Sequence, residues 1–504
     1  MYSKTILLKT RKVTFRLSKP PYLEKNNSAI FGNPINFNEA SFLMGNAELG
    51  NKIKGYWLKI DFNKDELKIT NDILGGYRVY YFTKENHTYI SDDYQFILKN
   101  FDNKPIKNKT EYDYWQKHSF TTGQATFIQD LFKISPASIL VINNHNFKET
   151  TYFKDLMRAA DKDKHQKLIH EDLLETFKSI KLSSKKIILL FSGGKDSCLL
   201  LQYLLHYNIS FIPVFLKLNP ISTFGASDIG RVRAISKKLD LKLDEVEINI
   251  SKITKEEKQE IINRQLFDRH YSLLHYLGCK EIEKKYGSSC LIINGQSSDS
   301  ILSFGPSEES LMSYFRRQIM YKPKTLISKL GLILLILKTK RVFKLPVNDT
   351  ERLIALFDEY KYTRVIDEKK GKNYFNYIKT YVIKKTQHLV SFQSKEMYVK
   401  ILSFSQGSDN QIVINSSKKY NLTTIMPFAT PKIIYSTIRY KNESLEIKKP
   451  KYVIESILVD EFSFYYKKLK LSNIDTSDLT IDINGVSSKE VNNLFLTKAS
   501  KIFI

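Results

Sequence analysis

The side chains best suited to chemistry lie in residues 192–197, where the sequence is SGGKDS. An uninterrupted apolar run, residues 187–191, precedes this segment, and the apolar segment after it has the composition of a helix. The order predicts a strand buried on both faces, then a glycine turn and a helix start. Backbone N–H groups at such a turn point outward and the helix dipole adds partial positive charge, so the turn suits a phosphate.

Each residue type in this turn fits a polyphosphate. Gly193 and Gly194 let a phosphate approach the backbone without meeting a Cβ atom. Ser192 and Ser197 add hydroxyl donors, and Asp196 is able to hold a divalent cation against the same phosphates. The segment is not a Walker loop, because the GxxxxGK(S/T) spacing is absent.

SGGKDS resembles the SGGxDS pyrophosphate loop of the ATP pyrophosphatase families, which cleave ATP between its α and β phosphates. The resemblance implies ATP and Mg²⁺ as ligands. It places the nucleotide at Ser192, Gly193, Gly194, Asp196 and Ser197. The alternative is a chance Ser-Gly turn between a strand and a helix.

A second loop follows another apolar strand, residues 290–294. Its sequence, NGQSSDSILSFG, is similar to the second signature of the asparagine synthetase superfamily, GEGxDE followed by a glycine; Gly295 and Asp299 match. The resemblance adds Gly295 to the residues expected to bind the nucleotide. A magnesium ion that bridges pyrophosphate oxygens is best held by oxygen ligands from both sides. Asp196 and Asp299 are therefore the predicted metal ligands, and the alternative for Asp299 is a solvated loop aspartate.

The second loop also departs from the family pattern. Gln296 stands where asparagine synthetases carry Glu, and Ser300 replaces another Glu. The resemblance implies that these positions face the acceptor rather than ATP. We expect the residues that bind ATP to follow the family pattern and the residues that face the substrate to depart from it. Gln296 is a candidate catalytic residue.

Strands and helices alternate on both sides of the first loop. Such an order predicts a Rossmann-like parallel sheet with helices on both faces and the ligand at the carboxyl ends of the strands. Ser227 or Asp228 is expected to cap the helix after the second strand. The predicted strands after the first loop are residues 209–218, 243–250 and 290–294, and the predicted helix is residues 228–239.

Residues 1–160 have short alternating runs broken by turn signals, which predict a β-rich domain. A hairpin is expected around Asp72, with Gly75 and Gly76 in its turn. The order of small motifs, taken with the later SGGKDS, resembles the glutaminase-type (Ntn-like) layered domain that precedes the ATP domain in the asparagine synthetase superfamily. The resemblance implies an α/β chain of two domains, residues 1–160 and 168–504.

The glutaminase chemistry of that family requires an amino-terminal cysteine as nucleophile. Here Tyr2 follows Met1, and no cysteine occurs before Cys198. We therefore expect a degenerate glutaminase-like domain that does not release ammonia from glutamine.

Composition bounds the remaining possibilities. A chain of 504 residues with 42% hydrophobic content buries a large core. The formal charge of +26 suits an anionic partner, but lysine is spread along the chain, so a nucleic-acid partner is not expected. The three cysteines form no CxxC pair, which favours a reducing cytoplasm. The most apolar run, residues 330–337, is too short to span a membrane and is expected to be a buried helix.

Relatives also use a lysine near the carboxyl terminus to stabilise negative charge during attack on an acyl-adenylate. Lys451, Lys467, Lys468 and Lys470 are the candidates, with Lys451 and Lys468 preferred. Basic helices in residues 310–400 are expected to present solvated faces.

Together these patterns predict an ATP-dependent ligase that forms an amide bond and releases AMP and pyrophosphate. The amine would come from the substrate or from free ammonia, which resembles β-lactam synthetases and lasso-peptide cyclases. The substrate would be a small-molecule or peptide carboxylate, with a precursor peptide or a partner protein as possible partners. The alternatives are a tRNA-modifying adenylating enzyme and a catalytically inactive scaffold that binds a peptide.

Overall fold

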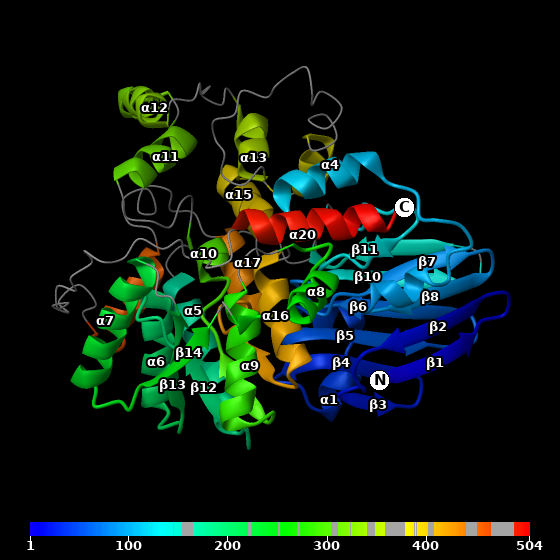
Figure 1. Cartoon of the computed structure of the whole chain (residues 1–504), viewed down its shortest axis with the longest axis horizontal. Coiled ribbons are helices and arrows are strands. Elements are labelled where there is room, and N and C mark those ends of the chain that lie inside the picture. The colour runs from blue at the N-terminus through cyan, green and yellow to red at the C-terminus, as the bar shows by residue number, and fades with distance from the viewer. Residues whose placement is uncertain are drawn as a thin grey trace.

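The computed structural model describes residues 1–121, 123–144, 146–153, 165–219, 223–249, 252–269, 273–303, 311–322, 324–339, 348–357, 379–387, 389, 391–401, 408–439, 451–464 and 488–503. Over these residues the chain is a mixed α/β structure. Two sheets occupy the amino-terminal part, and a parallel sheet surrounded by helices occupies the rest (Figure 1). The boundary predicted between the two parts falls mainly on residues outside this description.

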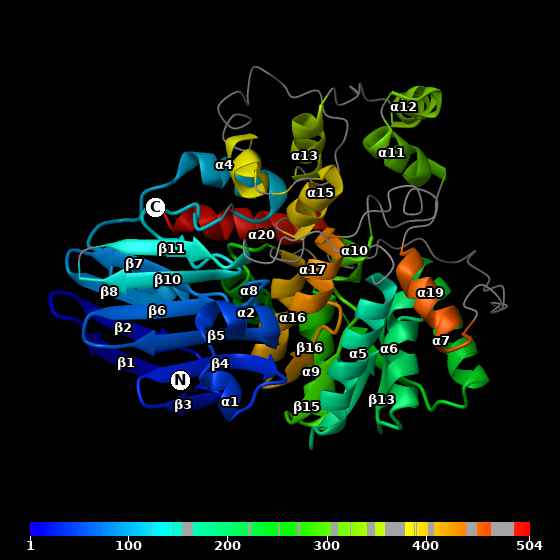
Figure 2. The same ribbon diagram turned by 180° about the vertical axis from the view of Figure 1, so that it is seen from behind.

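The amino-terminal part is two β-sheets packed face to face (Figure 2). The first sheet has the order β1-β2-β8-β7-β9 and is antiparallel except where β2 pairs with β8. The second has the order β11-β10-β6-β5-β4-β3 and is antiparallel throughout. The strands are β1 (Tyr2–Leu7), β2 (Lys12–Leu17), β3 (Leu23–Lys25), β4 (Ser28–Ile35), β5 (Lys54–Phe62), β6 (Glu66–Asn71), β7 (Tyr80–Lys84), β8 (His87–Ser91), β9 (Phe132–Lys133), β10 (Ser138–Asn143) and β11 (Phe147–Thr151).

Alternating side chains build the core between these sheets. Val13 and Phe15 on β2 point inward, while the residues between them are only partly buried. They join Leu67 and Ile69 of β6 in one buried cluster, as a strand period of two requires. Phe42 of α1 and Leu49 of α2 pack in one cluster with Trp57 of β5. The helices of this part are α1 (Glu39–Phe42), α2 (Asn46–Lys52), α3 (Tyr94–Leu98) and α4 (Lys109–His118).

The hairpin expected around Asp72 is wrong. β6 ends at Asn71, and the next strand, β7, belongs to the other sheet, so this turn carries the chain between the layers. The buried Asp72 carboxylate accepts hydrogen bonds from the backbone N–H groups of Trp57, Leu74 and Gly76 at 3.1, 2.9 and 2.9 Å. Burial raises its pKa to about 6, against the opposing effect of these hydrogen bonds.

The predicted parallel sheet is confirmed, with the strand order β14-β13-β12-β15-β16. The fifth strand, β16, has only three residues and was not expected. The sheet strands are β12 (Lys186–Leu190), β13 (Ile212–Asn219), β14 (Asp244–Asn249), β15 (Cys290–Ile293) and β16 (Thr423–Ile425). The helices connecting them include α5 (His165–Lys181), α6 (Lys195–His206), α7 (Thr223–Lys238), α8 (Lys255–Arg264), α9 (Leu274–Tyr286) and α10 (Ser298–Ile301).

The cap predicted for the helix after the second strand is wrong. Because α7 begins at Thr223, both Ser227 and Asp228 lie inside it. Asp228 instead pairs with Arg231 at 3.3 Å, one turn further along the same helix.

The carboxyl-terminal part adds mostly helices. They are α11 (Leu311–Tyr321), α12 (Leu326–Thr339), α13 (Asp349–Phe357), α15 (Phe392–Lys400), α16 (Ser408–Lys419), α17 (Pro431–Arg439), α19 (Tyr452–Asp460) and α20 (Ser488–Lys501). Among the described residues, no helix combines the length and the hydropathy needed to cross a bilayer. The expectation that residues 330–337 form a buried helix is wrong, because much of α12 is exposed.

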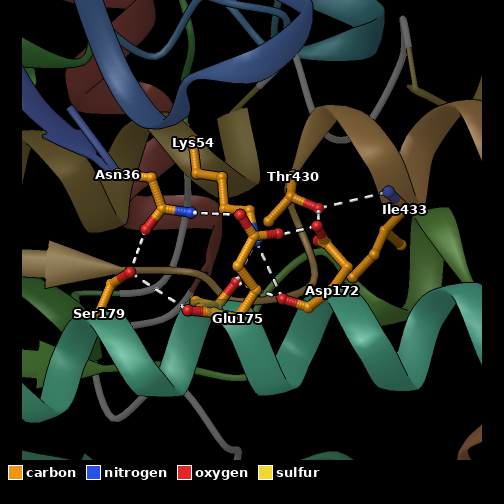
Figure 3. Close-up of polar contacts among 8 residues, drawn as sticks. Asn36, Lys54, Asp172, Glu175, Ser179, Thr430 and Ile433 are labelled. Atoms are coloured by element: carbon orange, nitrogen blue, oxygen red, sulfur yellow. Dashed lines mark hydrogen bonds and ion pairs between the residues drawn. The ribbon is translucent and has the colours of Figure 1, made fainter. Parts of the chain in front are cut away.

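A buried ion pair joins the amino-terminal sheets to the helices around the parallel sheet (Figure 3). The Nζ atom of Lys54, on β5, lies 2.9 Å from Oδ1 of Asp172 on α5 and donates to the hydroxyl of Thr176 at 2.9 Å. The hydroxyl of Thr430 donates to the other carboxylate oxygen. The side chains of Lys54 and Asp172 are only 4% and 1% exposed, so each charge depends on the other for solvation.

Replacing Lys54 with methionine tests whether this ion pair stabilises the fold. Lys54→Met leaves the buried Asp172 carboxylate without its cation, and we expect the free energy of unfolding to fall by about 3–5 kcal/mol. Urea unfolding followed by circular dichroism measures the change. Lys52→Met is the matched control, because its partner Glu48 is half exposed and the change should stay below about 0.5 kcal/mol. Equal losses in the two variants would contradict this role for Lys54.

Candidate functional site

The two predicted loops meet at the carboxyl edge of the parallel sheet. β12 and β15 are direct neighbours, with Leu189 opposite Ile293 in the parallel register. The strand order reverses at this pair, because β13 and β14 extend to one side of β12 while β16 lies beyond β15. Ligands of open α/β sheets bind in the crevice at such a reversal, outside the carboxyl ends of the strands.

The first loop leaves its backbone accessible at Gly194. Gly193 adopts a φ of +69°, and a Cβ atom there would lie 3.0 Å from a methyl carbon of Val232 on α7, so only glycine fits. Gly194 is the N-cap of α6, and no side chain caps that helix end. A Cβ atom at Gly194 would meet nothing within 4 Å except the hydroxyl of Ser192, at 3.4 Å. The open space above Gly194 is where an anion would meet the helix N-terminus.

Hydroxyl groups surround the same turn. The Oγ atoms of Ser192 and Ser197 lie 3.3 Å apart, and Ser197 donates to the backbone oxygen of Gly194 at 3.1 Å. Ser192 is exposed while Ser197 is buried. The turn therefore offers one hydroxyl to a ligand and uses the other to hold its own shape.

The second loop packs directly on the first. A Cβ atom at Gly295 would lie 3.3 Å from the Cβ atom of Asp196, so the absence of a side chain at Gly295 allows the close approach. The side chain of Asn294 accepts a hydrogen bond from the backbone N–H of Gln296 at 2.9 Å. Gln296 is partly buried and follows directly after Gly295 at the rim of the site, and its role toward the acceptor stays a prediction.

The two predicted metal ligands converge on one cation. The Nζ atom of Lys451 lies 2.6 Å from Oδ2 of Asp196 and 2.6 Å from Oδ1 of Asp299. Asp196 is at the start of α6, Asp299 is in α10 after β15, and Lys451 is the N-cap of α19. Three segments that are far apart in the sequence therefore meet in one cluster of charges.

The pKa values within the cluster follow from burial and charge. Burial raises the pKa of Asp196, Lys451 opposes that rise, and the negative charge of Asp299 adds to it. Burial lowers the pKa of Lys451, but its attraction to the two carboxylates is stronger, and the pKa lies above the usual value. The electrostatics of the pair thus favour a cation between Asp196 and Asp299.

Two buried polar atoms at this edge have no hydrogen-bond partner among the described residues. They are Oδ1 of Asp196 and Nδ2 of Asn294. An acceptor and a donor that are both buried and unsatisfied are unfavourable unless a ligand or water completes them. Their position beside the open loop suits a ligand that carries both a cation and oxygen acceptors.

Within the described part of the chain, no group of three or more His, Cys, Asp or Glu side chains could hold a metal ion. Asp196 and Asp299 supply only two carboxylates. Mg²⁺ is commonly bound by one or two carboxylates together with substrate phosphates and waters. The residues present fit a magnesium ion that arrives with a polyphosphate rather than one held by protein ligands alone.

Lys451 has a strained backbone. Its φ and ψ of 56° and 31° lie in the left-handed region, which is uncommon for residues other than glycine. Strain of this kind persists only where the surroundings determine the conformation, and it is frequent at functional sites. Here it aims the Lys451 side chain from the start of α19 at the two aspartates.

A second ion pair was not expected from the sequence. Lys195, in the variable position of SGGKDS, donates to Glu455 of α19 at 3.0 Å, and both side chains are largely buried. Glu455 lies four residues after Lys451, so both face the loop from adjacent turns of α19. The i, i+4 spacing was visible in the sequence, but nothing in it indicated that α19 packs on α6.

Ser300 and the candidate lysines near the carboxyl terminus are the remaining predicted residues. Ser300 is buried, and its hydroxyl donates to the backbone oxygen of Ser297 at 3.1 Å. Lys467, Lys468 and Lys470 lie outside the described residues, so Lys468 stays a prediction. Among the described residues, Lys451 is the proposed carboxyl-terminal lysine whose position is known, and it lies against the two loops.

The chain matches no known protein-family model, and it matches no curated protein at a significant level. The interpretation of the site therefore depends on its geometry.

A methyl group at Gly194 tests whether the open space binds an anion. In Gly194→Ala the backbone conformation is extended and tolerates alanine, so stability should hold or rise by about 0.4–1 kcal/mol. The methyl group would occupy the space over the helix N-terminus, and we expect calorimetric titration with ATP and Mg²⁺ to show affinity reduced roughly tenfold. Gly45→Ala is the control, because Gly45 is also an N-cap with no atom near its missing Cβ. Equal affinity in both variants would exclude Gly194 from the binding surface.

Proposed function

We propose that this chain is an ATP-dependent ligase that activates a carboxylate as an acyl-adenylate and joins it to an amine, with AMP and pyrophosphate as products. The observation that carries the proposal is the meeting of Asp196 and Asp299 on one ammonium group, above a glycine turn at the strand-order reversal. A phosphate turn and a carboxylate pair at that edge are what binding of a metal–polyphosphate requires.

The proposal assigns residues 168–504 to an ATP pyrophosphatase-type ligase domain of the asparagine synthetase superfamily. Residues 1–160 would be the degenerate glutaminase-like domain. The strand order of the parallel sheet and the two packed amino-terminal sheets support this assignment.

The proposed chemistry has two steps. A carboxylate oxygen of the substrate attacks the α-phosphorus of ATP, and the bond to the bridging oxygen of the β-phosphate breaks, so that pyrophosphate leaves. The amine nitrogen then attacks the acyl carbon, AMP leaves with the electrons of the carbon–oxygen bond, and the amine loses a proton to solvent. Holding the acyl-adenylate and the amine together makes the second step effectively unimolecular.

Residues of the site have distinct roles in this scheme. Ser192 and Gly194, with the N-terminus of α6, would hold the β and γ phosphates, while Gly193 and Ser197 give the turn its shape. Mg²⁺ bound by Asp196 and Asp299 would neutralise charge on the polyphosphate. Lys451, released from the aspartates by Mg²⁺, would stabilise the negative charge that develops during acyl transfer, as predicted for a lysine of this region. Gln296, at the rim, would contact the acceptor.

The nitrogen would not come from glutamine through this chain. Tyr2 occupies the position of the expected nucleophile, its hydroxyl donates to Glu24, and burial together with the Glu24 charge raises its pKa to about 12. Cys198, Cys279 and Cys290 are all buried, and burial raises the pKa of each thiol. None of these groups is a poised nucleophile at neutral pH.

One observation favours the inactive scaffold as a second candidate function. Lys451 already pairs with both aspartates, so part of their negative charge is balanced without a ligand. Magnesium-dependent binding of ATP separates the two functions, because a scaffold has no reason to retain it.

Binding of ATP with and without Mg²⁺ tests the carboxylate pair before the substrate is known. We expect Mg²⁺ to strengthen ATP binding, and Asp196→Asn and Asp299→Asn to remove that increment while they keep the weak metal-free binding. Where a substrate supports ATP–pyrophosphate exchange, each variant should lower the rate about 100-fold or more. Asp244→Asn is the control, because Asp244 pairs with Lys285 at the start of β14, on the opposite edge of the same sheet.

Three outcomes would count against the ligase. ATP binding that ignores Mg²⁺ in the unmodified chain would favour the scaffold. Exchange that occurs only when RNA is added would favour a tRNA-modifying enzyme. Full activity of Asp196→Asn or Asp299→Asn would refute the metal role of the pair.

A separate assay tests the nitrogen source. Purified protein supplied with glutamine should form no glutamate above the uncatalysed background, because it has no accessible thiolate. A positive result that survives in Tyr2→Phe and in Cys198→Ala would reveal a nucleophile elsewhere and overturn the description of residues 1–160.

A further inference from the structure

Over the described residues, exposed apolar side chains are concentrated on a helical hairpin outside the candidate site. α11 and α12 pack on each other, and almost half of the large apolar side chains that are exposed in the described residues belong to them. Figures 1 and 2 both show this hairpin at the periphery, on the side of the parallel sheet where β15 leads into α10. A patch of this kind on a protein surface commonly marks an interaction site.

The internal packing of the hairpin fixes which face of α12 is left outside. The hydroxyl of Ser328 donates to the backbone oxygen of Gln318 on α11 at 2.9 Å. A Cβ atom at Gly331 would lie 2.8 Å from the ring of Phe315, so the two helices approach closely there. Ser328, Gly331 and Leu335 thus form the inner face of α12, at helical spacing.

The outer face of α12 is a continuous aliphatic stripe. Leu326, Leu330, Ile333 and Leu337 follow the spacing i, i+4, i+7 and i+11, with side chains between 50% and 71% exposed. Ile327 and Leu334 widen the stripe on one side. Ser328 and Gly331 hold the inner face of α12 against α11, so rotation of α12 would not bury the stripe without loss of these contacts.

The charged residues of the segment that carries this stripe are all positive. Residues 310–348 contain nine Lys or Arg and no Asp or Glu. Lys322, Lys324, Lys329 and Lys338 are exposed near the two ends of α12, and none of them pairs with a carboxylate of the described residues. An aliphatic stripe flanked by unpaired lysines is complementary to a surface that is apolar within and anionic at its boundary.

We propose that the α11–α12 hairpin docks on an anionic membrane surface, with the outer face of α12 in the headgroup region. α12 has 14 residues, a length of about 21 Å, which is too short to span a bilayer but enough to lie along one. The stripe enters the boundary of the acyl chains while the lysines contact anionic headgroups. A second copy or an apolar peptide would cover the stripe but would leave the lysines unpaired.

Vesicle flotation of the full chain tests the proposal. Vesicles of phosphatidylcholine and phosphatidylglycerol in equal parts should carry the protein, binding should weaken as salt is added, and vesicles of phosphatidylcholine alone should carry little. Combined Leu330→Ser, Ile333→Ser and Leu337→Ser should lower the partition coefficient at least roughly tenfold. Combined Lys324→Glu and Lys329→Glu should lower it by a similar factor and remove the salt dependence.

Matched controls separate membrane binding by the hairpin from binding by exposed apolar side chains elsewhere. Leu43→Ser with Leu182→Ser removes two leucines that are 86% and 84% exposed elsewhere on the surface, and binding should not change. Ile333→Trp should be quenched by brominated lipid, whereas Trp57 and Trp115, both fully buried, should not. Circular dichroism and thermal unfolding establish that each variant is folded.

Several results would overturn the proposal. They are absence of flotation with anionic vesicles, unchanged partition of the triple serine variant, and no quenching of Ile333→Trp. If the unmodified chain dimerises without vesicles and the triple serine variant is monomeric, the stripe instead binds a second copy. Because none of these readouts uses ATP, failure here and failure of the proposed ligase function are distinguishable.

Discussion

The pairing of β12 with β15 is the constraint on which the candidate site depends. The loop after β12 carries Asp196 and the loop after β15 carries Asp299, about a hundred positions later. Parallel pairing brings both strand ends to the same edge, and Gly295 lets the loops touch. A one-strand change in the sheet order would separate the two carboxylates by the width of an intervening strand.

Lys451 shows how such a site is held when its charges are partly buried. Two carboxylates at close range repel each other, and burial makes that repulsion stronger. The ammonium group of Lys451 offsets this repulsion, and it is positioned by a backbone conformation that is itself unfavourable. The pair of Lys195 on α6 with Glu455 on α19 holds these two helices together. Asp196 and Lys451 lie on the same two helices, so this pair also keeps them close to each other.

A second set of buried charges is also held by pairing. Lys54 and Asp172 form a buried pair between the amino-terminal sheets and α5, and Thr430 completes the hydrogen bonds of Asp172. These charges lie far inside and are matched group by group. The lysines of the α11–α12 hairpin differ, because they are exposed and surround an aliphatic face that the described fold does not cover. This contrast is the reason for treating the hairpin as an interaction surface rather than as part of the core.

Local sequence was sufficient for the elements that depend on neighbouring residues. The alternation of strands and helices predicted a parallel sheet. The apolar run before SGGKDS and the two glycines of SGGKDS predicted a turn at the carboxyl edge of that sheet. The structure has both. Strand periodicity also predicted the β-rich amino-terminal part. These features follow from hydrophobic period and backbone freedom, which a short segment carries by itself.

Tertiary structure decided everything that depends on distant partners. Lys451 could not be chosen over the neighbouring lysines from sequence, because only the packing of α19 on α6 brings it to Asp196. The turn at Asp72 was interpreted as a hairpin because its glycines look the same whether a chain folds back or crosses between layers. The run at residues 330–337 was expected to be buried because it is apolar, yet only Gly331 and Leu335 of this run are buried. Leu330, Ile333, Leu334 and Leu337 are exposed. Apolar residues favour burial, but only the assembled fold determines whether another segment covers them.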